Sequence, residues 1–186
     1  CVDAEDTGWR DDGSVVELDK AAIELAVKLY PWEWMVHDAC GAQLAAAPTR
    51  WIEPPWKAIL SNKGILPLLW EMCPGHPNLL PAYFEGDPEA AKLGASFVRK
   101  PLYSREGANI ALISGGTTLV EHEGPYGAEG FIRQGFAPLP NFSGQYPVVG
   151  SWLVDHAPWG LAIRADANPI PGQTSGCRPH AALQNP

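Results

Sequence analysis

The chain has 186 residues, of which 46% are hydrophobic and 18% are charged, and these values are typical of a folded globular protein. Its formal net charge of −8 argues against binding to nucleic acid or to anionic membrane surfaces, because both require clustered Lys and Arg side chains. No apolar run approaches the roughly 20 residues that span a bilayer, so we expect one domain, or two small subdomains, without a membrane segment.

The first twelve residues are acidic and lack an apolar core, so no signal peptide is expected. The first residue is not Met, and we expect that an upstream portion of the chain is missing. The four cysteines are too scattered for a zinc site or a small disulfide scaffold, and they predict reduced thiols in the cytoplasm. They are Cys1, Cys40, Cys73 and Cys177.

Two helices are predicted in the first part of the chain. Residues 18–34 carry apolar side chains at helical spacing, interrupted by Pro31, and residues 54–70 begin with two prolines that suit a helix entry. Lys63 follows Trp56 by seven residues and is therefore expected on the apolar face of the second helix. A lysine there either extends its ammonium to solvent or binds an anion.

Beyond Pro81 the chain is divided into short apolar segments by Gly-containing and polar turns, a pattern that predicts β-strands. Turns of a few residues favour antiparallel pairing. Together with the helices, these strands predict an α+β fold. The predicted strands cover residues 97–102, 110–113, 117–120, 131–136, 146–154 and 160–164.

The most informative segment covers residues 98–109. Strand alternation places Val98 and Lys100 on one face, so Lys100 points into a partly enclosed place if that face is covered. The loop that follows contains Gly107, whose freedom lets backbone N–H groups approach an anion. This arrangement suits ATP phosphates, although a solvent-exposed hairpin has the same pattern. The loop residues are Ser104, Arg105, Glu106, Gly107, Ala108 and Asn109.

Other candidate residues are less specific. Arg164 ends the last predicted strand, where its guanidinium could hold a transferring phosphoryl group or could simply be exposed. The five histidines show neither a catalytic triad order nor metal-ligand spacing. Most of the eight tryptophans are assigned to packing, although an acidic, antiparallel, Trp-rich domain could instead be a non-catalytic carbohydrate-binding module. Those assigned to packing are Trp32, Trp34, Trp56, Trp70, Trp152 and Trp159.

Taken together, several segments resemble the synthetase domain of glutathionylspermidine synthase and its relatives, and most closely the stand-alone branch that lacks an amidase domain. The resemblance covers roughly residues 25–180 in the same order. The matching segments are LYPWEWM (29–35), EPPWKAILSNK (53–63), HPNLLPAYF (76–84), VRKP (98–101), SREGANI (104–110), GFIRQGF (130–136) and VGSWLV (149–154).

The resemblance implies an ATP-grasp fold of the glutathione-synthetase-like kind, with nucleotide held between two α+β subdomains that have largely antiparallel sheets. Residues 60–130 would form the nucleotide-covering subdomain and residues 131–180 the hinge and remaining sheet. By matching position, Lys63 and Lys100 would contact ATP phosphates, the 104–109 loop would cover them, and Arg164 would close over the transferred phosphoryl group. The hinge against adenine would be Arg133, Gln134, Gly135 and Phe136.

The implied enzyme is a ligase that forms a C–N (amide) bond. ATP would phosphorylate a substrate carboxylate, and an amine would displace the phosphate from the acyl phosphate. Glutathione and a polyamine are the default substrates, and Mg²⁺ would neutralise the phosphate oxygens. The family's magnesium ligands lie upstream of the matched portion, so we expect the chain to be an incomplete fragment with weak or absent turnover.

Overall fold

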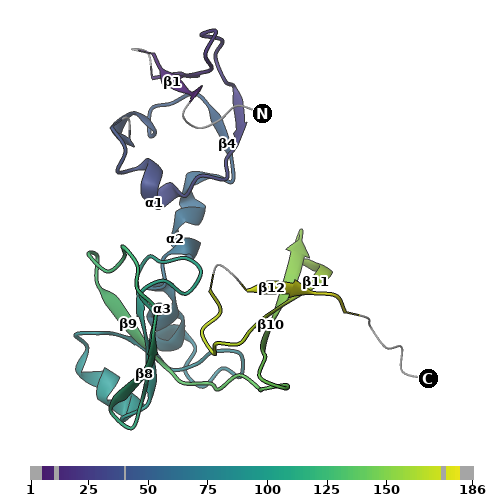
Figure 1. Ribbon diagram of the computed structural model, residues 1–186. Coiled ribbons are helices and arrows are strands. Elements are labelled where there is room, and N and C mark those ends of the chain that lie inside the picture. The colour runs from purple at the N-terminus through teal and green to yellow at the C-terminus, as the bar shows by residue number, and fades with distance from the viewer. Residues whose placement is uncertain (1–5, 11–12, 40, 173–174, 181–186) are drawn as a thin grey trace. The chain divides into compact units, whose positions relative to one another are not determined.

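The computed structural model describes residues 6–10, 13–39, 41–172 and 175–180, and it divides into two compact units (Figure 1). The first unit covers Cys1–Asn62 and the second covers Lys63–Pro186. None of the helices in these described residues is both long and apolar enough to cross a membrane.

The first unit is built from short elements. Its buried apolar side chains include Val15, Val16 and Trp32, and the Trp32 ring meets Trp51 edge-on at 5.5 Å between ring centroids. Strands β1 and β2 are antiparallel, whereas β3 and β4 are parallel. The elements are β1 (Gly8–Trp9), β2 (Val15–Val16), β3 (Leu25–Val27), α1 (Trp32–Met35), η2 (Gly41–Gln43), β4 (Arg50–Ile52), η3 (Pro55–Lys57) and α2 (Ala58–Ser61).

The helix predicted over residues 18–34 is wrong. Residues Leu25–Val27 form a strand because they pair with Arg50–Ile52, a distant segment whose backbone satisfies their hydrogen bonds. The supposed apolar stripe is not a stripe, since Leu29 is 98% exposed. Only α1 is helical here, and it begins directly after Pro31.

The second predicted helix is broken into pieces. Helix α2 ends at Ser61 because Asn62 adopts an extended backbone, and α3 begins at Ile65. Lys63 therefore lies in the connection between two helices, and the prediction that it shares a helical face with Trp56 is wrong. The side chain of Trp56 is 62% exposed, so the predicted apolar face is not buried.

The second unit contains a five-stranded sheet in the order β5-β9-β6-β7-β8, antiparallel throughout. The mixed helix and antiparallel-sheet character predicted from sequence is confirmed. Gly115 and Gly116 form the two-residue turn of the β7–β8 hairpin with φ of 58° and 80°, which this turn requires. The strands are β5 (Ala82–Phe84), β6 (Phe97–Pro101), β7 (Ala111–Ser114), β8 (Thr117–Glu121) and β9 (Phe131–Gly135).

Two helices accompany this sheet, α3 (Ile65–Met72) and the 3-10 helix η4 (Pro88–Leu93). The Asp87 side chain caps η4 by accepting a 2.8 Å hydrogen bond from the Glu89 N–H group. The Trp70 indole of α3 donates to the Tyr83 hydroxyl at 3.3 Å. The core of the sheet contains Ile132, which is fully buried, together with Ala82, Ala111 and Leu112.

A second, three-stranded antiparallel sheet follows, formed by β10 (Tyr146–Val154), β11 (Ala157–Asp166) and β12 (Gly176–Arg178). Apolar side chains at the hairpin end of β10 and β11 are exposed, including Trp152 at 68% and Trp159 at 73%. The packing prediction is confirmed for Trp32 but wrong for Trp152 and Trp159, because no other element of the described chain covers them. It is also wrong for Trp34 and Trp56, which are 43% and 62% exposed.

The Ile132→Ala variant should be strongly destabilised, because Ile132 is fully enclosed between β5 and β6. We expect a loss of about 2–5 kcal/mol in the free energy of unfolding, measured by urea denaturation. Ile59→Ala is the matched control, since Ile59 is 62% exposed and its truncation should cost less than about 0.5 kcal/mol. Equal losses in the two variants would contradict this core.

Candidate functional site

The predicted loop connects β6 to β7 and has a constrained backbone. Glu106, Gly107 and Asn109 adopt left-handed conformations, with φ of 51°, 78° and 53°. The Ala108 N–H donates to the Arg105 carbonyl at 3.0 Å, and the Ile110 N–H donates to the Gly107 carbonyl at 3.1 Å. The loop is therefore a compact turn stabilised by backbone hydrogen bonds between its own residues, a feature expected of a preorganised binding loop.

Gly107 is required by contact as well as by backbone angle. A Cβ atom at this position would lie 2.8 Å from the Pro171 carbonyl oxygen and 3.2 Å from His122 Nδ1. The loop thus rests on the segment after β11 and on the residue after β8. Three separate parts of the second unit converge at this glycine.

Lys63 anchors the beginning of the loop. Its ammonium donates 2.9 Å hydrogen bonds to both the carbonyl and the hydroxyl oxygen of Ser104. Its backbone N–H donates to the Leu102 carbonyl at 2.8 Å. The structure therefore brings two of the predicted site residues into direct contact, although Lys63 does not lie on a helix.

Lys100 lies on the same face of β6 as Val98, as strand alternation predicted, and its side chain is partly buried there. Its ammonium donates a 2.7 Å hydrogen bond to Oε1 of Gln134, which is itself only 7% exposed. Lys100 is paired in register with Ile132, so Gln134 is the diagonal neighbour on the same face. Burial lowers the pKa of Lys100 from its ordinary value, since desolvation disfavours the charged form.

The opposite face of the same strands carries a different cluster. Arg99 forms a two-pronged ion pair with Glu85, at 2.7 and 2.9 Å, and Arg133 lies 3.5 Å from the same carboxylate. Hydrogen bonding from Arg99 lowers the pKa of Glu85. The Arg99 guanidinium also stacks 3.4 Å from the centroid of the Phe131 ring, and Arg133 lies over Phe97.

The predicted hinge residues are therefore divided between the two faces. The Gln134 side chain faces Lys100, whereas the Arg133 side chain faces Glu85. Strand β9 lies between β5 and β6, so its backbone groups serve the two ladders, and the Gly135 N–H donates to the Pro81 carbonyl at 2.8 Å. Phe136 follows the strand and is 36% exposed.

Arg164 lies on β11, where it is paired with Val148 and Cys177. Its guanidinium donates a 2.8 Å hydrogen bond to the Gly172 carbonyl. Since Gly107 packs against the neighbouring Pro171, Arg164 and the 104–109 loop both contact the same short segment. Asp166 accepts hydrogen bonds from the Ser175 hydroxyl and the Asn168 N–H, and these bonds lower its pKa.

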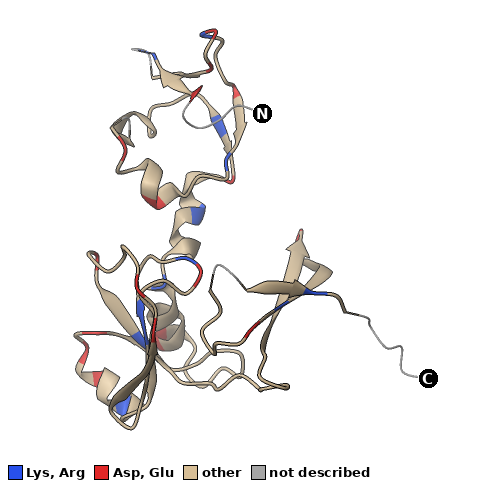
Figure 2. Cartoon of the chain, viewed as in Figure 1, with Lys and Arg blue, Asp and Glu red and all other residues tan. Residues whose placement is uncertain are grey.

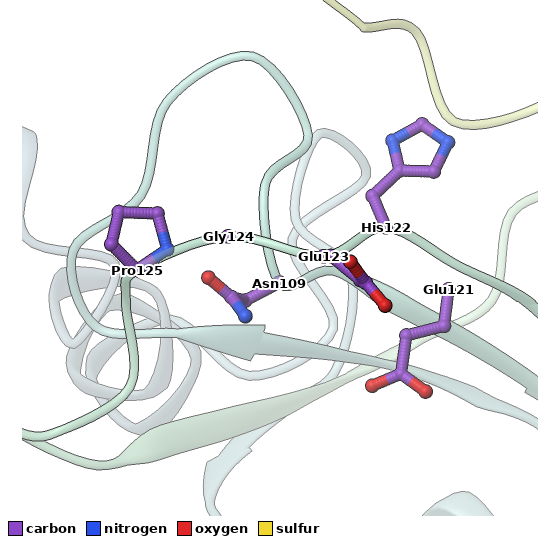
Figure 3. Close-up of a pocket in the computed structure, with 6 residues that line it drawn as sticks. All are labelled: Asn109, Glu121, His122, Glu123, Gly124 and Pro125. Carbon is purple, nitrogen blue, oxygen red and sulfur yellow. The ribbon is translucent and has the colours of Figure 1, made fainter.

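A hollow of about 850 Å³ lies beside the loop, and Figure 3 shows the residues that line it. Sequence analysis missed this feature, because its acidic residues match no motif. The Asn168 side-chain amide donates a 3.1 Å hydrogen bond to Nε2 of His122, and Asn109 Oδ1 accepts a 2.8 Å hydrogen bond from the Tyr126 N–H. The lining residues are Asn109, Glu121, His122, Glu123, Gly124 and Pro125.

Charges of both signs are interspersed over the second unit (Figure 2). Within the described residues, no group of three or more His, Cys, Asp or Glu side chains is arranged to hold a metal ion. Cys73 and Cys177 are exposed free thiols, as the sequence predicted, whereas Cys1 and Cys40 lie outside the described residues.

Comparison with known proteins gives a consistent result. A family model described as glutathionylspermidine synthase preATP-grasp matches residues 1–183. A putative acid–amine ligase of Haemophilus influenzae is 40% identical over 95% of this chain and 46% of its own length. Trypanothione synthetase of Crithidia fasciculata is 30% identical over 99% of this chain and 31% of its own length.

The bifunctional glutathionylspermidine synthetase/amidase of Escherichia coli is 26% identical over 94% of this chain and 32% of its own length. The chain thus spans less than half the length of each of these three curated relatives.

The Lys100→Met variant should change how stability depends on pH. The lowered pKa of Lys100 means that the unfolded state binds more protons between that value and the ordinary lysine pKa, so the wild-type chain should gain stability as pH rises through this window. In urea denaturation from pH 7 upward, the free energy of unfolding of the wild type should rise relative to that of Lys100→Met. A constant difference between the two proteins would contradict burial of a charged ammonium.

Gly107→Ala should destabilise the loop more than Gly75→Ala does. Both glycines have a left-handed φ, 78° and 75°, so both substitutions carry a backbone cost of roughly 1–2 kcal/mol. Only Gly107 adds a clash with Pro171, because nothing lies within 4 Å of a Cβ at Gly75. Tryptic cleavage after the exposed Arg105 should accelerate in Gly107→Ala alone, and equal cleavage would refute the close contact.

Proposed function

The chain belongs to the glutathionylspermidine synthase preATP-grasp family, and on this basis we propose that it is part of an ATP-dependent ligase that joins a carboxylate to an amine. Its relatives are ligases, including proteins named as an acid–amine ligase and as synthetases. The observation that carries the proposal is the buried Lys100 ammonium, which lies on the strand that leads into the compact 104–109 loop.

A partly buried ammonium is costly unless it is paired with a negative charge and hydrogen-bonded, because the charged form loses hydration. In the proposed function Lys100 contacts the ATP phosphates, and a polyphosphate would supply the negative charge that the surrounding apolar face lacks. Lys63 contributes a second cation at the start of the loop. The loop backbone covers the phosphates. The hydrogen bonds from Lys63 to Ser104 tie this lysine to the start of the loop.

The remaining roles are proposed, and contacts within the second unit support them. Arg164 closes over the transferred phosphoryl group, since its guanidinium already holds the segment against which Gly107 packs. Residues 133–136 form the adenine hinge. Phe136 follows the end of β9, so its backbone is not paired with neighbouring strands on both sides. The proposed fold is ATP-grasp, of the glutathione-synthetase-like kind.

The reaction begins when the substrate carboxylate attacks the γ-phosphorus of ATP and ADP leaves. The amine then attacks the acyl carbon and phosphate leaves, which gives the amide. The chain's own residues position the phosphates and neutralise their charge. Bound Mg²⁺ would supply further charge neutralisation, but the described residues offer no group of ligands for it. Glutathione and a polyamine are the proposed substrates, and the cytoplasm is the proposed compartment.

We also propose that a larger polypeptide completes this site. The chain spans less than half the length of the three relatives compared above, and apolar side chains of the β10–β11 hairpin are exposed. The portion of the relatives that lies outside the match would cover these side chains and supply the magnesium ligands. On this account the present chain binds nucleotide but turns over weakly or not at all.

Nucleotide binding can be tested by thermal shift, because a ligand of the folded state raises the melting temperature. ATP with Mg²⁺ should stabilise the wild-type chain, by about 2.7 kcal/mol at one hundred times the dissociation constant. Lys63→Met and Lys100→Met should each weaken or abolish the response. Lys92→Met is the matched control, since Lys92 is an exposed lysine of the same unit that pairs with Glu89.

An undiminished response in both test variants would contradict the assignment of the phosphate site. The alternative function, carbohydrate binding, is favoured by the exposure of Trp152 and Trp159. Oligosaccharides in place of ATP provide its test. Stabilisation by an oligosaccharide, lost in Trp152→Ala and accompanied by no response to ATP, would favour that alternative.

A further inference from the structure

The hydrogen bond from Lys100 to Gln134 does more than fill space in the sheet. Gln134 is one of three polar residues that are buried in the described chain, and its Oε1 atom lies 2.7 Å from the Lys100 ammonium. Both side chains project from the same face of the sheet, because Lys100 is paired with Ile132 and Gln134 lies two residues further along β9. The buried Gln134 amide is therefore in direct contact with the partly buried Lys100 ammonium.

Among the described residues, no charged side chain forms an ion pair or a hydrogen bond with Lys100. The residues that share its face on the neighbouring strands are apolar, including Val98, Leu112, Ile132 and Ala82. Arg99, Arg133 and Glu85 belong to the opposite face. Other titratable groups on or beside this sheet include Tyr83 on β5, Glu121 on β8, Lys63 beside the loop, Glu71 on α3, and Glu89 and Lys92 on η4. Desolvation is the cause of the lowered Lys100 pKa.

Gln134 is therefore well placed to stabilise the charged form of Lys100. A carbonyl oxygen that accepts from an ammonium forms a charge-assisted hydrogen bond, which is stronger and more directional than a bond between neutral groups. Without this acceptor, burial would favour the neutral amine, which attracts phosphate far less. The amide also fixes the direction of a long side chain that would otherwise sample several rotamers.

We propose that Gln134 is a positioning residue, whose side-chain carbonyl keeps the Lys100 ammonium charged and aimed for the nucleotide phosphates. This inference rests on the proposed ATP-dependent function. It assigns the Gln134 side chain to the phosphate end of the site rather than to adenine recognition. Gln134 then acts on the nucleotide through Lys100.

The test follows the titration of Lys100 directly, by NMR of the chain labelled with ¹³C at lysine Cε and assigned with Lys100→Arg. In Gln134→Met, an unbranched side chain without an acceptor, Lys100 should lose its proton at a lower pH than in the wild type. In Gln134→Glu, a carboxylate partner should move the titration to a higher pH. The exposed Lys92 reports in the same spectra and should titrate identically in all three proteins.

Nucleotide affinity provides the functional half of the test. ATP should bind Gln134→Met about tenfold more weakly at pH 7, because a hydrogen bond to a charged group is lost. The deficit should grow with pH as Lys100 loses its proton. A merely structural role for Gln134 would lower stability without moving the Lys100 titration or the pH profile of binding.

The possible failures can be distinguished. If Lys100 titrates at the same pH in Gln134→Met and Gln134→Glu as in the wild type, this inference is overturned while the proposed function stands. Unchanged ATP affinity in Gln134→Met, with Lys100→Met defective, would overturn it equally. If the wild-type chain binds no nucleotide, the proposed function fails and this inference fails with it. Should Gln134→Met not fold, the direction of the shift in Gln134→Glu decides.

Discussion

The 2.7 Å hydrogen bond between Lys100 and Gln134 joins a partly buried cation to a buried amide on one face of the five-stranded sheet. An ammonium in that position loses hydration, and its apolar neighbours offer no hydrogen bonds in exchange. The sheet therefore maintains a charge at a cost in stability. Such a cost is typical of a binding or catalytic site, where a perturbed group is kept for its chemistry.

The position of the 104–109 loop follows from the same strand. Because Lys100 lies on β6 and the loop begins shortly after that strand, the buried ammonium and the loop are close in the chain. Lys63 holds the first loop residue, and the left-handed Gly107 lets the loop rest against Pro171. Arg164 donates a hydrogen bond to the adjacent Gly172, so a displacement of this segment would alter the contacts of both the loop and the arginine.

Sequence patterns predicted the strands well and the helices poorly. The predicted strands depend on local alternation and Gly-containing turns, and Ser114 to Thr117 folds into the expected hairpin turn. The helix over residues 18–34 is absent because Leu25–Val27 pairs with a segment some 25 residues away, and local spacing contains no information on that pairing. Alternation also predicted the buried direction of Lys100, whereas its partner Gln134 depends on β6 and β9 being neighbours. The hollow beside Asn109 likewise brings together residues that share no motif.

The most direct measurement is a crystal structure of the chain with a non-hydrolysable ATP analogue and Mg²⁺. The account predicts a phosphate oxygen about 2.7–2.9 Å from Lys100 Nζ, with Gln134 still in contact with that ammonium and the 104–109 loop lying over the phosphates. A nucleotide bound elsewhere, with Lys100 in contact with Gln134 alone, would contradict it.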